Sequence, residues 1–215
     1  MTKETLTRKH IILSVVAVAL LALAVWLWQY SQSMRQLKRN DKFAIKPFSL
    51  INMDGHRFTN KNLEGRWSLI FFGFTNCPSI CPTTLSRLDK AYRMLVEQKT
   101  NPMPQIIFIS VDPERDGPYT IRQYLANFNK KFIGAMGSKE EINKLTEQFR
   151  VVYAKSESDD MDYYISHSGK IMVINPKGSL VATLKPPFDA ESIAKDFHNI
   201  QKNYQKEERD DHKKR

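Results

Sequence analysis

Cysteine is scarce in this chain, which has two cysteines among 215 residues. That number excludes a disulfide-dense secreted scaffold, a four-cysteine zinc ribbon and an iron–sulfur cluster held by cysteines alone. The sequence also contains no internal repeat. Its 41% hydrophobic and 26% charged residues exclude a collagen-like or wholly disordered chain. The length suits one domain with extensions.

Little of the positive charge falls where a folded domain is expected. The net charge is +10, of which residues 1–40 carry +5, residues 201–215 carry +2 and residues 41–200 only +3. This distribution argues against a dedicated nucleic-acid surface and favours charge beside a membrane. We therefore expect no nucleic-acid partner.

One long stretch, residues 11–30, has no charged residue. Twenty residues of helix are about 30 Å long, which matches the hydrocarbon thickness of a bilayer. Trp26, Trp28 and Tyr30 lie at one end, as interfacial aromatic residues do. We predict an N-terminal segment at 1–10, one transmembrane signal-anchor at 11–30 and a linker at 31–42. The alternative, a signal peptide cleaved near Ala24, is disfavoured because the apolar run continues beyond that point.

Residues 43–200 show strands and helices in alternation. A hairpin around Asp54-Gly55 comes first, and an antiparallel pair and a final helix to about Lys202 come last. This order predicts an α/β domain with a thioredoxin-like fold and a central mixed β-sheet flanked by helices. The expected strands are 67–74, 105–111, 151–155, 163–167, 170–175 and 179–184, and the expected helices are 82–99, 119–128, 138–150 and 189–202. Residues 201–215 form a charged tail.

Cys77 and Cys81 follow the first buried strand and precede a helix. Open α/β sheets place their sites at this end of a strand, and a helix N-terminus lowers the pKa of a cysteine. If Cys81 lies in the first helical turn, residues i and i+4 share one face, so both sulfurs can point to one spot. Such a pair can close into a disulfide or hold a thiophilic ion. The alternative is a static disulfide or two buried small residues.

Two thiolates and one imidazole suit Cu(I), which is soft and accepts few ligands. Of the five histidines, His167 ends a predicted strand and enters a Ser-Gly turn, where a neighbouring strand end could bring it near the cysteines. We expect surface or packing roles for the other four, which are His10, His56, His198 and His212.

The segment from Ser110 to Asp116 follows the second buried strand, so it is expected at the same sheet edge as the cysteines. Its acidic residues could tune a cation site, dock a partner or cap the helix that starts near Tyr119.

In these residues the chain resembles the Sco/SenC family of membrane-anchored, thioredoxin-fold copper-binding proteins, which help assemble the Cu-A centre of cytochrome c oxidase. The resemblance runs from about Phe43 to Phe197. It rests on PFSLINMDGHRF, LEGRWSLIFFGFTNCPSICPTTL, ISVDPERD and HSGKIMVINPKG taken together. It implies that Cys77, Cys81 and His167 are copper ligands. The family usually has Asp where this chain has Ser79 and Ser166, so two negative charges near the metal are missing, which puts Cu(II) binding in question.

The resemblance implies a copper metallochaperone whose partners are the oxidase subunit with the Cu-A site, a copper donor and a thiol reductant. The chain has no long Arg/Ser-rich presequence. A bacterial inner membrane, with residues 1–10 in the cytoplasm and the domain in the periplasm, is therefore the expected location. The alternative function is a thiol–disulfide oxidoreductase in which Cys77 attacks a target disulfide and Cys81 resolves the mixed disulfide. A peroxidase is disfavoured, because Thr75 stands two residues before Cys77 and not three.

Overall fold

The computed structural model describes residues 20–26, 43–151, 153–155, 165–167 and 169–213. The chain divides into two units, residues 1–39 and 40–215. In the first unit, residues 20–26 are helical. No helix within the described ranges is both long and apolar enough to cross a bilayer. The predicted span at 11–30 and linker at 31–42 lie mostly outside these ranges, so both stay predictions.

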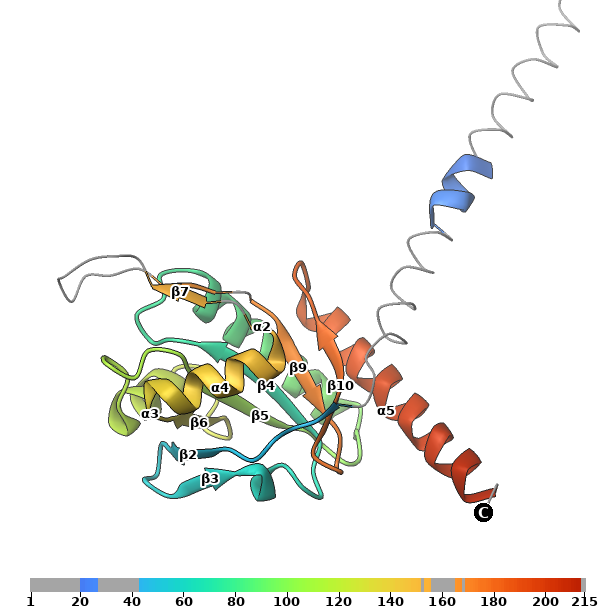
Figure 1. Ribbon diagram of the computed structural model, residues 1–215. Helices are drawn as coiled ribbons and strands as arrows, with labels where there is room; N and C mark the ends of the chain where they lie inside the picture. The colour runs from blue at the N-terminus through green and yellow to red at the C-terminus, as the bar shows by residue number, and fades with distance from the viewer. Residues whose placement is uncertain (1–19, 27–42, 152, 156–164, 168, 214–215) are drawn as a thin grey trace, which may run out of the picture. The chain divides into compact units, whose positions relative to one another are not determined.

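The second unit is built on an eight-stranded mixed sheet (Figure 1). The strand order is β1-β10-β9-β4-β5-β6-β2-β3, in which β4, β5 and β6 run parallel and the other neighbours pair antiparallel. The strands are β1 (Phe43–Ala44), β2 (Ser49–Asn52), β3 (Arg57–Thr59), β4 (Ser68–Gly73), β5 (Gln105–Ser110), β6 (Ile133–Met136), β9 (Ile171–Ile174) and β10 (Ser179–Leu184). The predicted mixed sheet is confirmed, and it has the connectivity expected of a thioredoxin-like domain.

Four helices cover the sheet, with α2 (Ile80–Glu97), α3 (Pro118–Ala126) and α5 (Ala190–Lys213) on one face and α4 (Lys139–Phe149) on the other (Figure 1). A short 3-10 helix (Asn60–Asn62) follows β3. Because neighbouring residues of a strand point to opposite faces, β4 supplies both layers. Phe72 contacts Phe149 of α4, with ring centroids 5.5 Å apart. Phe71 contacts Phe108 of β5 on the opposite face, with centroids 6.2 Å apart.

Strand β4 is the centre of the core. All six of its residues are buried, because helices cover both of its faces and strands flank both of its edges. Its parallel neighbour β5 is buried from Ile106 to Ser110. The ends of these two strands therefore provide a rigid edge from which the next loops start.

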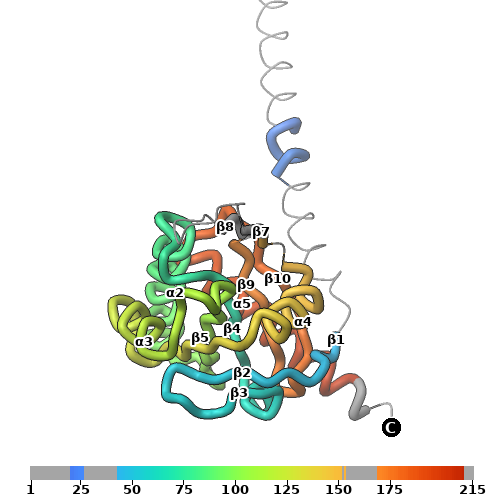
Figure 2. The backbone as a smooth tube through the Cα atoms, turned by 60° about the vertical axis from the view of Figure 1, so that its left-hand side comes forward, coloured from blue at the N-terminus to red at the C-terminus, as the bar shows by residue number. Residues whose placement is uncertain are grey.

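Three features differ from the sequence-based expectations. Strand β6 was not predicted. It is four residues long and contains Gly134, where a Cβ would stand 2.2 Å from Cγ2 of Ile121, so the strand needs a residue of low β-propensity. Helix α5 continues to Lys213, past the predicted end near Lys202. Strands β7 (Tyr153–Lys155) and β8 (Ile165–His167) form a separate two-stranded sheet, which Figure 2 shows at one end of the domain.

Candidate metal centre

Cys77 and Cys81 lie together where β4 gives way to α2. Cys81 is the second residue of α2, so the predicted position in the first helical turn is confirmed. Its backbone N–H donates a hydrogen bond to Sγ of Cys77 over 3.4 Å. Both cysteines are thiols. A helix N-terminus thus faces the sulfur of Cys77, which favours negative charge on that sulfur.

Gly73, the last residue of β4, makes room for the sulfur of Cys81. A Cβ at this position would stand 2.7 Å from Sγ of Cys81 and 2.8 Å from the ring of Phe108. A larger residue therefore cannot occupy the position without displacing one of them. The sulfur of Cys81 is seated directly on the end of the central strand.

The pair is buried, with Cys77 7% exposed and Cys81 fully enclosed. Burial raises the pKa of the Cys81 thiol, and a hydrogen bond with the Cys77 side chain raises it further. The expectation that the helix N-terminus lowers the pKa is therefore wrong for Cys81, because desolvation outweighs the helix. Burial therefore makes loss of the Cys81 proton harder, and a metal ion must replace that proton in order to bind the sulfur.

His167 is the last residue of β8, and Cα pairing sets it opposite Tyr153 of β7. Its side chain is outside the described part of the structure. Two residues further on, Gly169 is buried, and a Cβ there would stand 3.2 Å from Cγ2 of Ile80, the residue before Cys81. Gly169 therefore lies close to the first turn of α2.

Of the other four histidines, the structure describes the side chains of two. His56 is exposed after the β2–β3 turn, and His198 is exposed on α5. His10 and the side chain of His212 are outside the described residues. In the part of the chain that is described, no three His, Cys, Asp or Glu side chains cluster as metal ligands do. The side chain of His167 lies outside that part.

The segment after β5 packs against the cysteine loop, as its predicted place at the same edge implied. The guanidinium of Arg115 lies 5.8 Å from the centroid of the Phe74 ring and forms a 2.5 Å ion pair with Asp112. Asp116, only 1% exposed, accepts hydrogen bonds from Thr75. Burial raises the pKa of Asp116, although hydrogen bonds from Ser110 and Thr75 oppose this. The N-cap of α3 is Gly117, so these acidic side chains point inward and do not cap the helix.

Tyr124 of α3 was not anticipated as part of this region. Its ring packs on Phe108 with centroids 5.9 Å apart, and its hydroxyl is buried with no hydrogen-bond partner among the described residues. Burial raises the pKa of Tyr124, and the nearby Cys81, Cys77 and Asp116 raise it further. The sequence placed this residue only within the predicted helix at 119–128, and no sequence signal connected it with the cysteines.

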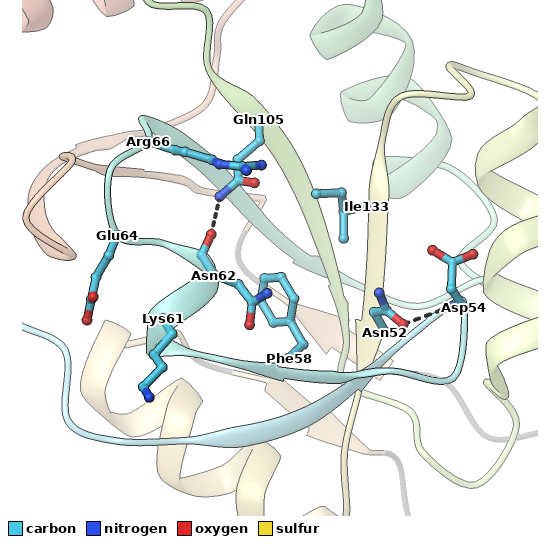
Figure 3. Close-up of a pocket in the computed structure, with 9 residues that line it drawn as sticks. All are labelled: Asn52, Asp54, Phe58, Lys61, Asn62, Glu64, Arg66, Gln105 and Ile133. Atoms are coloured by element: carbon cyan, nitrogen blue, oxygen red, sulfur yellow. Dashed lines mark hydrogen bonds between the residues drawn. The ribbon is translucent and has the colours of Figure 1, made fainter.

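A cavity of about 300 Å³ lies elsewhere on the domain (Figure 3). Of the residues that line it, Arg66 stands two residues before β4 and Gln105 is the first residue of β5, whereas the cysteines follow the end of β4. The charged residues around it are of both signs, namely Asp54, Lys61, Glu64 and Arg66. The cavity is therefore separate from the cysteine site.

The SCO1/SenC family model matches residues 36–202, which includes the whole cysteine region. The chain belongs to the SCO1/SenC family. Among its relatives, the mitochondrial protein SCO1 homolog 1 of Arabidopsis thaliana is 41% identical over 148 residues. That match covers 68% of this chain and 44% of the Arabidopsis protein, so the chain spans less than half of this relative's length.

Solved structures of the family share the fold. The crystal structure of Arabidopsis thaliana ScoI with copper bound is 38% identical, has a TM-score of 0.70 and is covered completely by 75% of this chain. The structure of BsSco is 26% identical with a TM-score of 0.61, and the match covers 77% of this chain and 97% of that one. BsSco has a disulfide switch and belongs to the Sco family of cytochrome c oxidase assembly proteins.

Proposed function

We propose that this chain is a membrane-anchored copper metallochaperone. It takes up copper as cargo through the sulfurs of Cys77 and Cys81 and the imidazole of His167, and delivers it for assembly of the Cu-A centre of cytochrome c oxidase. The observation that carries the proposal is the pair of adjacent buried thiols at the start of α2, in a chain of the SCO1/SenC family. A copper-bound relative with the same fold supports the choice of metal.

The residues fit this cargo chemically. Two thiolates are soft ligands, which Cu(I) prefers over the oxygen ligands that suit magnesium or calcium. The closeness of Gly169 to Ile80 supports His167 as the third ligand, because Gly169 stands two residues after His167 and Ile80 stands one residue before Cys81. Burial of the pair excludes water and favours a metal of low coordination number.

Variants at the three ligands test the proposal in the full-length chain purified in detergent. We expect Cys77→Ala or Cys81→Ala to abolish stoichiometric Cu(I) binding, measured by competition with a chromophoric chelator. His167→Ala is expected to weaken binding severely while the circular dichroism spectrum stays unchanged. His56→Ala and His198→Ala are the matched controls, since both residues are exposed and neither belongs to the β4–α2 turn that holds the cysteines. Wild-type affinity in His167→Ala would contradict the three-ligand site.

The oxidation state of the pair should control loading. Closing a Cys77–Cys81 disulfide removes two of three ligands at once, because the thiolate and not the disulfide sulfur binds metal. Because the periplasm is oxidising, we propose that a dedicated thiol reductant keeps the pair reduced and that a copper donor then loads it. Equal Cu(I) affinity of the oxidised and reduced chain would place the metal away from the cysteines.

A thiol–disulfide oxidoreductase is the second candidate, favoured by the hydrogen bond from the α2 N-terminus to Cys77. In this reaction the Cys77 thiolate attacks a target disulfide and expels one target thiolate. Cys81 then gives its proton to the expelled target thiolate, and its sulfur attacks the Cys77 sulfur and expels the other target sulfur, so the target is reduced and the pair is oxidised. His167→Ala separates the candidates, because it should spare reduction of a model disulfide while impairing copper binding.

The proposed location is a bacterial inner membrane, with residues 1–10 in the cytoplasm, a single span at 11–30 and the domain in the periplasm. The uncharged run of twenty residues supports it. A C-terminal alkaline phosphatase fusion should be active and a C-terminal green fluorescent protein fusion dark. The reverse pair of results would overturn this topology.

A further inference from the structure

The side chain of Asp116 connects the cysteine loop to the end of β5. Its carboxylate accepts hydrogen bonds from the Thr75 backbone N–H at 3.0 Å, the Thr75 hydroxyl at 2.5 Å and the Ser110 hydroxyl at 2.5 Å. Thr75 stands two residues before Cys77, and Ser110 is the last residue of β5. Three donors from two separate segments thus converge on one carboxylate.

Burying this carboxylate costs free energy. A carboxylate that is 1% exposed has lost nearly all its hydration, and only its hydrogen bonds offset that loss. The bonds are charge-assisted, so they are stronger and more directional than bonds between neutral groups. They fix the first residues after β4, from which the chain continues directly to Cys77.

We propose that Asp116 is a positioning residue of the metal site, which holds the loop before Cys77 so that the two sulfurs are preorganised to bind copper. This inference rests on the proposed function. Asp116 itself does not touch the metal. It acts through Thr75, and its effect is on the energy needed to order the loop when a ligand binds.

The hydrogen-bond geometry allows the positioning effect of Asp116 to be separated from the effect of its negative charge. One oxygen of Asp116, Oδ2, accepts from both the Thr75 N–H and the Ser110 hydroxyl, and Oδ1 accepts from the Thr75 hydroxyl. In Asp116→Asn the amide oxygen can keep the first two bonds, while its NH₂ group donates to the Thr75 hydroxyl, which rotates to accept. The asparagine variant therefore loses the negative charge and keeps the network, whereas Asp116→Ala loses both.

The first test measures iodoacetamide labelling of Cys77 in the folded full-length chain without metal, with sites assigned by mass spectrometry. Loss of the network opens the loop, so we expect Asp116→Ala to be labelled about tenfold faster than wild type. Asp116→Asn should stay within about threefold of wild type. Equal rates in the two variants would mean that charge and not position matters, and a wild-type rate in Asp116→Ala would also overturn the proposal.

The matched control is Asp89→Ala. Asp89 is another buried carboxylate, 7% exposed, and it accepts hydrogen bonds from Arg93 and Asn129. Its loss destabilises the fold without touching Thr75, so the labelling rate of Cys77 should remain within about twofold of wild type. A tenfold rise in this control would show that labelling follows global stability.

Cu(I) competition on the same proteins completes the experiment. We expect about tenfold weaker binding in Asp116→Ala and near-wild-type binding in Asp116→Asn. If Asp116→Ala does not fold, Thr75→Val decides, because it removes the hydroxyl bond and keeps the backbone bond. It should raise labelling about threefold, and a wild-type rate would refute the proposal. If wild type binds no Cu(I), the proposed function fails while the labelling comparison still decides on Asp116.

Discussion

At the scale of single residues, Gly73 is a tightly constrained position next to Cys81. It is a glycine because the sulfur of Cys81 and the ring of Phe108 occupy the space that a side chain would need. We expect Gly73→Ala to lower the free energy of unfolding by about 1–3 kcal/mol, as overpacking does, and to weaken Cu(I) binding by displacing the sulfur. Thermal unfolding and chelator competition measure the two effects.

Gly117→Ala is the control for this substitution, since a Cβ there meets nothing within 4 Å and its backbone φ of −93° is ordinary. It should leave copper affinity unchanged. A Gly73→Ala chain that binds copper as wild type does would show that the Cys81 sulfur is free to move.

Asp116 should also leave a signature in the pH dependence of stability. Because burial raises the pKa of Asp116, the folded chain binds this proton more tightly than the unfolded chain. Its contribution to stability is therefore fully present below the ordinary pKa of about 3.9 and is lost as the pH rises through the raised value. We expect the gain in unfolding free energy from Asp116→Asn to be larger at pH 7 than at pH 4. A gain that increases toward acid pH in chemical denaturation would contradict the sign of this shift.

At the scale of elements, α4 shows how a short polar signal fixes a helix start. Ser138 is its N-cap and accepts a hydrogen bond from the Glu141 backbone N–H over 3.3 Å. The Glu141 carboxylate accepts from the Ser49 backbone N–H over 3.2 Å, which connects α4 to β2. We expect Ser138→Ala to lower the free energy of unfolding by about 1 kcal/mol, and Ser138→Asp to retain most of it, in urea denaturation. A neutral alanine variant would mean that packing alone sets the start of α4.

The main elements follow from the sequence because their signals are local. The buried run of β4, the helix with Cys81 in its first turn and the hairpin at Gly55 each depend on neighbouring residues. Strand β6 was not predicted because Gly134 is required by close packing against Ile121, a residue distant in sequence, and glycine does not itself indicate a strand. The last turns of α5 were not predicted because they have no apolar pattern. Their Gln, Lys, Glu and Arg residues nevertheless have a high helix propensity.

The cysteine site was only half predictable for the same reason. The positions of Cys77 and Cys81 follow from a strand and a helix that are adjacent in sequence. The hydrogen bonds from Thr75 to Asp116 join residues 41 positions apart in sequence, and no spacing rule predicts such a pair. The packing of Tyr124 behind the site likewise depends on how α3 lies over Phe108.

At the scale of the whole molecule, α5 packs on the sheet along only part of its length. Phe197 and Ile200 are buried, and the ring of Tyr204 lies 5.3 Å from that of Trp67. Beyond Tyr204 the helix makes an ion pair between Glu208 and Lys177, whose side chains are 28% and 64% exposed. Removing residues 206–215 should therefore change the free energy of unfolding by less than about 1 kcal/mol.

Phe197→Ala is the comparison for that truncation. It deletes a fully buried ring and should cost about 3–5 kcal/mol by urea denaturation. A truncated chain that loses as much stability as Phe197→Ala would show that the end of α5 supports the domain.

The position of Trp67 gives the domain a built-in optical probe. This indole is 2% exposed and touches Phe197 and Tyr204 edge-on, with centroids 5.6 Å and 5.3 Å away. The other tryptophans of the chain are Trp26 and Trp28. With these two changed to phenylalanine, all tryptophan fluorescence comes from Trp67 and reports whether α5 is packed against it. The length of β4 keeps Trp67 about 20 Å from the cysteines, so fluorescence can follow unfolding while a separate copper assay follows loading.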